Sequence, residues 1–96
     1  MRVADLKPRI TLREPASDPM QIIRQVAAIN DVTMDQILGD SRRRPIAWAR
    51  QHAYERLYRE TRLSLPGIAR IFKKDHTTVL YGILKHRKRK AEGMAI

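Results

Sequence analysis

The chain has 96 residues, no cysteine and a formal net charge of +10 at pH 7. This length suits one domain with a single modest core, and the lack of cysteine excludes a disulfide framework and a thiolate metal site. With no signal-peptide pattern at Met1 and no apolar run long enough to cross a bilayer, we expect a cytoplasmic protein.

Positive charge is concentrated in the second part of the chain. Residues 41–96 hold 15 Lys and Arg against 4 Asp and Glu, a balance of +11, whereas residues 1–40 hold 5 against 6. An evenly charged soluble domain would not gather its cations in this way. The asymmetry indicates a polyanionic partner, with nucleic acid as the first candidate and an anionic membrane surface as the second.

The pattern divides the chain into three parts. Residues 1–17 contain two prolines and little periodicity, which is typical of an extended arm. Residues 18–90 show helical signals and form the predicted domain, and residues 91–96 are a short tail. The only candidate strand is a few residues around Ile10 to Leu12.

Two helices are predicted first in the domain. Asp18 followed by Pro19 is typical of an N-cap with proline at the first helical position, and apolar residues at helical spacing extend this helix to about residue 30. Thr33 and Gln36 form a capping-box pattern, and Gly39 is placed to end a short helix of about two turns.

A basic loop and a long helix follow. The loop, residues 40–45, contains three adjacent arginines, and Pro45 is expected to open a helix that runs to about Arg62. The apolar stripe of this helix consists of Ile46, Ala49, Ala53 and Leu57. Its flanking aromatic residues, which we expect to pack in the core, are Trp48, Tyr54 and Tyr58.

Two further helices complete the predicted domain. Ser64 is expected to cap a short helix, with Pro66 tolerated in its first turn, and Asp75 is expected to cap the last helix. The apolar residues that the last helix can bury are Val79 and Ile83, with Leu80 and Leu84 as further candidates.

The last two helices match a helix-turn-helix pattern. Ala69 is the small residue that lets two steeply crossing helices approach, and Ile68, Phe72 and Val79 are the apolar anchors around it. Lys73 stands at the turn position that often holds glycine. A generic helical hairpin could share this pattern and remains the alternative. From the helical signals and this pattern together, we predict an all-α fold of about five helices with an embedded helix-turn-helix.

The first turn of the last helix carries side chains that can read bases. The carboxylate of Asp75 can accept a hydrogen bond from N4 of cytosine, and the imidazole of His76 can form a hydrogen bond with the acceptors of guanine or adenine. The methyl groups of Thr77 and Thr78 fit against the methyl group of thymine. The structural alternative is that Asp75 is only an N-cap. Adjacent threonines are poor helix formers, which favours a reading role.

These residues resemble a known family. The segment KDHTTVLYGILKH is similar to the signature of the DNA-binding C-terminal domain of the bacterial replication initiator DnaA. The resemblance continues upstream through SLPGIARIF, WARQHAYERL and RRRP, and it covers about residues 18–88.

The resemblance implies a Trp-repressor-like helical domain that binds double-stranded DNA, with the last helix in the major groove and the basic loop in the minor groove. The base contacts that it implies are Arg44 from the loop, and Asp75, His76 and Thr77. The implied phosphate contacts are Arg42, Arg43, Gln51, Leu65, Pro66, Lys73, Lys74 and Thr78.

The sequence also departs from this family. The turn before Asp75 is one residue shorter than the common form, and Tyr81-Gly82 replaces the usual histidine-alanine pair. Glycine inside a helix costs about 1 kcal/mol relative to alanine, so we expect Gly82 to pack closely against another helix. None of the four glycines has the spacing of a phosphate-binding ATPase loop. The chain is then either a free-standing relative of the DNA-binding domain or an excised one. The N-terminal arm and Met1 favour the first, so we expect a free-standing, nucleoid-associated regulator of transcription or replication.

Enzymatic and metal functions are not indicated. His52, His76 and His86 lack partners at ligand spacing, so we expect no metal, no cofactor, no small-molecule substrate and no catalysis. The basic tail, residues 86–93, can be the solvated end of the last helix, grip phosphates or bind anionic lipid; its lack of aromatic residues disfavours the lipid.

Two rival functions remain open from the sequence. One is a nucleic-acid binder without sequence preference, including an RNA binder. The other is a protein-docking module that uses Trp48, Tyr54 and Tyr58. No heptad pattern is visible, so we expect a monomer.

Overall fold

The computed structural model describes residues 18–93, and all regular structure in this range is helical. The predicted arm, with its candidate strand, and the end of the tail lie outside the described residues. The helices are α2 (Pro19–Asn30), α3 (Met34–Leu38), α4 (Arg44–Glu60), α5 (Leu65–Phe72) and α6 (His76–Ala91). The all-α prediction is confirmed.

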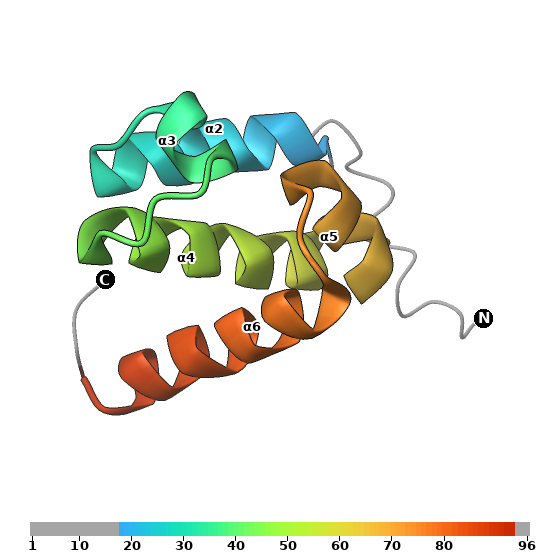
Figure 1. Cartoon of the computed structure of the whole chain (residues 1–96). Coiled ribbons are helices and arrows are strands. Elements are labelled where there is room, and N and C mark those ends of the chain that lie inside the picture. Colours follow the sequence, from blue (N-terminus) through green and yellow to red (C-terminus); the bar gives the residue numbers. More distant parts are fainter. Residues whose placement is uncertain (1–17, 94–96) are drawn as a thin grey trace.

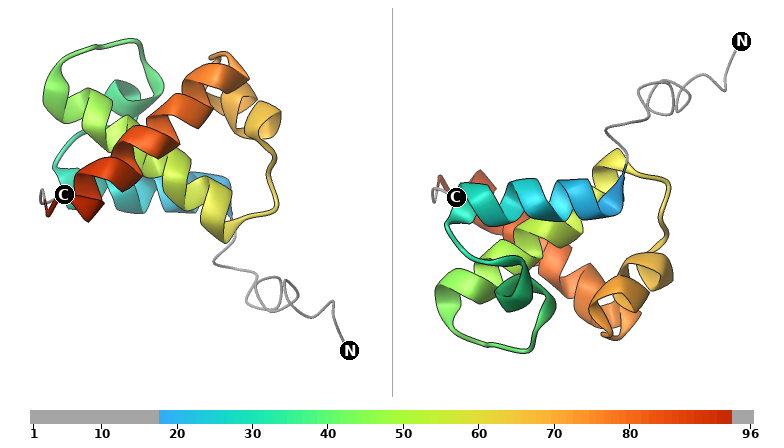
Figure 2. Two further views of the ribbon diagram at one scale, coloured as in Figure 1. Left: turned by 90° about the horizontal axis from the view of Figure 1, so that it is seen from below. Right: turned by 90° about the horizontal axis from the view of Figure 1, so that it is seen from above.

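Helix α4 is the centre of the arrangement. Helix α2 lies on one side of it and α6 crosses it on the other, as the opposite views in Figure 2 show, while α3 packs beside α2 and α4. Helix α5 lies near one end of α4 and packs on the start of α6 (Figure 1). The last two helices are therefore held against the long helix.

The predicted helix starts are confirmed in the first two helices. The carboxylate of Asp18 accepts from the backbone N–H of Met20, and Pro19 opens α2. Thr33 and Gln36 form the capping box of α3, with bonds of 3.0 and 2.9 Å, and Gly39 follows its end. Helix α3 has five residues and is shorter than expected.

Helix α4 differs slightly from its prediction. It begins at Arg44 rather than Pro45, and it ends at Glu60. Thr61 closes the end, because its hydroxyl donates to the carbonyl of Leu57 at 2.6 Å. Thr61 itself is extended, with φ of −126° and ψ of 178°, so the helix ends before Arg62, where we had expected the end.

The core is formed by all five described helices, and it includes Tyr54, which was predicted as an aromatic residue flanking the stripe of α4. Its members are Ile22, Ile23, Val26, Ala27, Ile37, Ala49, Ala53, Tyr54, Leu57, Ile68, Ala69, Phe72, Val79 and Ile83. The ring of Tyr54 meets that of Phe72 edge-on, with centroids 4.9 Å apart. Gly82 is buried against Tyr54, which confirms the close packing expected there.

Some predicted core residues lie at the surface. Tyr58 is 46% exposed, so the expectation that it packs in the core was wrong, and the candidates Leu80 and Leu84 are also not buried, at 37 and 49% exposed. The face of α6 that meets α4 carries Val79, Gly82, Ile83 and His86, and Leu80 and Leu84 lie outside it. Trp48 is half-buried.

The basic tail is not simply a solvated helix end. His86 and Arg89 are only 2% and 9% exposed, because this part of α6 still packs against α4. Arg87 stays exposed but its guanidinium lies 3.4 Å from the carboxylate of Glu55 on α4. Of the three uses left open for the tail, a solvated helix end does not apply to His86 and Arg89. No helix in residues 18–93 is long and apolar enough to span a membrane.

Candidate nucleic-acid interface

The first turn of α6 presents polar side chains to solvent. Asp75, His76, Thr77 and Thr78 are all exposed. Asp75 occupies the N-cap position, but its carboxylate makes no capping bond to the described backbone and accepts from the Thr77 hydroxyl at 2.9 Å. This hydrogen bond, first among the causes, lowers the pKa of Asp75, so the carboxylate is a charged acceptor at neutral pH. His76 Nδ1 lies 3.4 Å from the same carboxylate.

The turn between α5 and α6 is closed by backbone bonds. Ser64 caps α5, as predicted, by accepting from the N–H of Gly67 at 3.2 Å. At the other end, Lys73 adopts the left-handed conformation with φ of 57° and ψ of 45°, and the N–H of Lys74 donates to the carbonyl of Ala69 at 2.9 Å. A lysine thus occupies a conformation that usually favours glycine.

An ion pair joins this turn to the basic loop. The ammonium of Lys74 contacts the carboxylate of Asp40, which is largely exposed. The hydrogen bond from Lys74 is the first cause of the lowered pKa of Asp40. The pair brings the segment before α4 close to the segment before α6, although 34 positions separate the two residues.

The arginines of the basic loop point into solvent. Arg42, Arg43 and Arg44 are exposed, and the backbone N–H of Arg43 donates to the Ser41 hydroxyl at 3.2 Å. Arg44 is already the first residue of α4, and its guanidinium lies 5.8 Å from the ring centroid of Trp48. Arg44 therefore projects from a helix start rather than from the middle of a loop.

Arg50 holds this loop from inside the fold. It is 7% exposed and donates to three carbonyls, those of Ile37 at 2.7 Å, Gln36 at 2.9 Å and Ser41 at 2.9 Å. The acceptors belong to the end of α3 and to the loop that follows it. No role for Arg50 is predicted from the sequence, because its carbonyl partners are supplied only by the tertiary fold.

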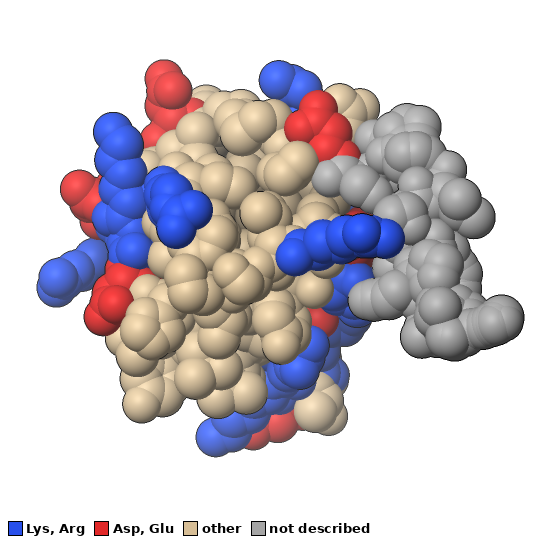
Figure 3. Space-filling view, turned by 90° about the vertical axis from the view of Figure 1, so that its right-hand side faces the viewer, with Lys and Arg blue, Asp and Glu red and all other residues tan. Residues whose placement is uncertain are grey.

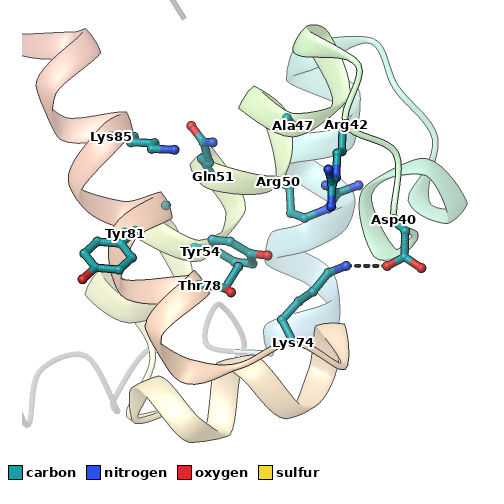
Figure 4. A pocket seen from close by; sticks show the side chains of 11 residues that line it. Asp40, Arg42, Ala47, Arg50, Gln51, Tyr54, Lys74, Thr78, Tyr81 and Lys85 are labelled. Carbon is teal, nitrogen blue, oxygen red and sulfur yellow. Dashed lines mark hydrogen bonds and ion pairs between the residues drawn. The ribbon is translucent and has the colours of Figure 1, made fainter.

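A pocket of about 450 Å³ lies between the loop, α4 and α6 (Figure 4). Its lining includes the cations Arg42, Arg50, Lys74 and Lys85, the carboxylate Asp40 that pairs with Lys74, and the polar residues Gln51 and Thr78. The hydroxyl of Tyr54 also lies there, buried and without a partner among the described residues. Burial raises the pKa of Tyr54 to about 12, so it is a neutral donor. Cations and donors in one hollow suit a phosphate oxygen.

The predicted site residues fall into separate groups. The pocket brings together Arg42, Gln51, Lys74 and Thr78, whereas the implied base contacts Asp75, His76 and Thr77 lie outside its lining in the first turn of α6. Leu65 and Pro66 form the first turn of α5, Lys73 is the exposed residue of the turn, and Arg43 and Arg44 flank the start of α4. The missed Lys85 stands seven residues after Thr78, a spacing that places both on one helical face.

Lys and Arg side chains are spread around one end of the molecule. Figure 3 shows the end at which α5 lies, with Lys and Arg along its lower edge, at its left-hand margin, at its top and to the right of its centre. Acidic side chains are interspersed among them and the centre is largely uncharged.

These features define a class of protein. A short capped helix, a tight turn and a second helix whose first turn is polar and exposed, all packed on a long helix, make a helix-turn-helix domain. The family described as the bacterial DnaA protein helix-turn-helix matches residues 19–85, and the chain belongs to this family. Membership makes it a DNA-binding domain.

Individual relatives agree with this assignment. The chain is 48% identical over 67 residues to the chromosomal replication initiator protein DnaA of Nostoc punctiforme, a match that covers 69% of this chain and 15% of the relative. It is 40% identical over 74 residues to the DnaA protein of Thermus thermophilus, a match that covers 76% of this chain and 17% of the relative. It is 44% identical over 78 residues to the DnaA protein of Clavibacter sepedonicus, a match that covers 79% of this chain and 16% of the relative. The chain thus spans about a sixth of the length of these relatives. No solved structure matches it at a comparable level of significance.

Proposed function

We propose that this protein binds double-stranded DNA with sequence specificity. The first turn of α6 enters the major groove, where Asp75, His76 and Thr77 contact base edges, and Arg44 from the start of α4 enters the minor groove. A helix that presents its N-terminal residues to the major groove is the usual geometry of this class. The family membership supports DNA binding in general, and the groove assignments are our proposal.

The single observation that carries the proposal is the unused N-cap of α6. The side chains of Asp18, Thr33 and Ser64 each accept from a backbone N–H of the helix that they begin. In α6 the backbone N–H groups of His76 and Thr77 help to lower the pKa of the Asp75 carboxylate, but no capping bond of normal geometry forms in residues 18–93, and the carboxylate stays exposed. A residue needed only to start the helix would use its side chain for the cap.

Phosphate contacts hold the domain on the duplex. The exposed cations Arg42, Arg43 and Lys73 attract the phosphate backbone of the DNA. Lys74, Gln51 and Thr78 offer hydrogen-bond donors from the pocket. Leu65 and Pro66 lie in the first turn of α5; Pro66 has no N–H and the N–H of Gly67 is bonded to Ser64, so the donor that this pair offers to a phosphate is the backbone N–H of Leu65. Such contacts give affinity without sequence preference. They also make the affinity depend strongly on salt: the logarithm of the binding constant falls with the logarithm of the salt concentration, with a slope of about −0.9 per phosphate neutralised.

The biological role that fits this activity is regulation by occupancy of DNA sites. A domain that acts by binding needs no cofactor, metal or small-molecule substrate, and we propose that it works as a monomer in the cytoplasm, on the nucleoid. It would control transcription or replication by occupying sites or by competing for sites that an initiator uses.

A selection from randomised duplex DNA at near-physiological salt tests the proposal. We expect an enriched motif, because base contacts give each good bidentate pair about 1–3 kcal/mol of discrimination. Binding without a motif, or stronger binding to RNA, would favour the nucleic-acid binder without sequence preference. No binding at all would favour the protein-docking module.

A further inference from the structure

The end of α6 extends beyond the matched family segment. The match ends at Lys85, whereas α6 continues to Ala91. Two residues of this extension, His86 and Arg89, are buried against α4. A helix end that served only as a charged tail would leave both side chains in water.

Arg89 makes two specific contacts on α4. Its Nη1 donates to Oε1 of Gln51 at 2.7 Å, and its guanidinium lies 4.4 Å from the ring centroid of Trp48. Nε and Nη2 of Arg89 are buried without a hydrogen-bond partner among the described residues. Burial of two unpaired donors is unfavourable, so stability alone accounts poorly for this arrangement.

The bond fixes the orientation of the Gln51 amide. Arginine can only donate, so the atom of Gln51 that faces it must be the carbonyl oxygen Oε1. The amide nitrogen Nε2, which can only donate, is then left for another partner. Gln51 also lines the cationic pocket, together with Lys74, Thr78 and Lys85 (Figure 4). A phosphate oxygen can only accept, and it therefore needs the amide in this orientation.

We propose that Arg89 is a positioning residue for DNA binding, which acts by turning the amide nitrogen of Gln51 toward a DNA phosphate. This inference rests on the proposed function. Because Arg89 is 9% exposed, its own guanidinium is poorly placed to contact the duplex. Arg89 thus makes the extension of α6 part of the binding apparatus without touching DNA.

A double-mutant cycle separates positioning from direct contact. The variants are Arg89→Met, Gln51→Ala and the pair together, and the measurement is affinity for the selected duplex at several salt concentrations. We expect Arg89→Met to weaken binding about three- to tenfold, the scale of one hydrogen bond, with an unchanged salt slope. In the Gln51→Ala protein the same substitution should have no further effect.

The opposite results would overturn the inference. Additive effects of the two substitutions would show that Arg89 does not act through Gln51. A salt slope reduced by about one unit would show that Arg89 itself neutralises a phosphate. Arg24→Met, an exposed change on α2 with the same loss of charge, is the matched control. In the Arg24→Met protein, Gln51→Ala should reduce the affinity by the same factor as in the wild-type protein.

Folding and function can be told apart in this experiment. The melting temperature followed by circular dichroism reports whether each variant is folded; Trp48 fluorescence would not serve, because the Arg89 guanidinium lies 4.4 Å from the centroid of the Trp48 ring and its removal alone would change the signal. If Arg89→Met does not fold, Arg89→Lys replaces it in the cycle. Lysine can still donate to Oε1, so this variant should bind more tightly than Gln51→Ala, and equal or weaker binding would overturn the inference. A wild-type protein that binds no duplex would refute the proposed function itself.

Discussion

The ring of Tyr54 on α4 lies directly against the backbone of Gly82 on α6. A Cβ atom at position 82 would meet Cδ2 of Tyr54 at 2.6 Å and Cε2 at 2.9 Å. The ring cannot easily retreat, because it packs edge-on against Phe72. This contact sets the distance between α4 and α6, and with it the position of the first turn of α6.

Gly82→Ala should therefore destabilise the domain, although alanine is the better helix former by about 1 kcal/mol. We expect a net loss of about 1–3 kcal/mol in the free energy of unfolding, because the overpacked core must shift. Urea denaturation measures the change. Leu84→Ala, on the exposed face of the same helix, is the control and should change stability by about 0.5 kcal/mol or less. An equally small effect at Gly82 would contradict the packing described.

Asp40→Asn should raise the affinity for DNA. The carboxylate of Asp40 neutralises Lys74, which lines the pocket assigned to phosphate, and its removal frees that cation. We expect tighter binding to selected and random duplexes alike and a salt slope about one unit steeper, measured by fluorescence anisotropy. Asp31→Asn makes the same charge change at a left-handed position that asparagine tolerates. If both substitutions have the same effect, only net charge matters and the ion pair does not mask Lys74.

The predictable part of this structure is local. The caps at Asp18, Thr33 and Ser64 and the apolar stripes depend on neighbouring residues, and the structure confirms them. The burial of Arg50 and Arg89 depends on partners 9 to 14 and 38 positions away. A cationic side chain near other cations has the pattern of a surface residue, and only the tertiary fold supplies its carbonyl, amide and aromatic partners.

Arg50→Met should loosen the basic loop as well as the core. Three carbonyl groups at the end of α3 and in the loop would lose their common donor. We expect a loss of about 2–4 kcal/mol in the free energy of unfolding, since buried acceptors left unpaired are costly. Calorimetry measures this loss. Arg50→Lys should recover only part of it, because an ammonium cannot match the planar fork of donors. Full recovery would show that charge alone suffices.

Acidification should weaken the contact between α4 and α6 before it affects the carboxylates. The rings of His52 and His86 stack with centroids 4.8 Å apart, and His52 Nδ1 lies 3.1 Å from the amide nitrogen of Asn30, so it must accept. Burial, followed by the neighbouring His86, lowers the pKa of His52 to about 4, and burial also lowers that of His86.

The direction of the pH effect follows from these shifts. Between pH 4 and 6.5 the unfolded chain binds more protons than the folded one, so stability is complete above pH 6.5 and is lost as pH falls toward 4. We expect the melting temperature to fall between pH 7.5 and 5, a range above the titration of the carboxylates. His52→Gln should flatten this dependence, and a melting temperature that stays constant over the same range in the wild-type protein would contradict it.

The most direct test of the reading role assigned to α6 compares His76→Ala with Arg43→Ala. Both side chains are exposed, but His76 is assigned to a base edge and Arg43 to a phosphate. The measurement is the ratio of affinities for the selected duplex and for a scrambled duplex at about 0.15 M salt. We predict that His76→Ala lowers this ratio, whereas Arg43→Ala weakens both complexes about equally and leaves the ratio unchanged. Equal effects of the two substitutions on any duplex would contradict the reading of bases by the first turn of α6.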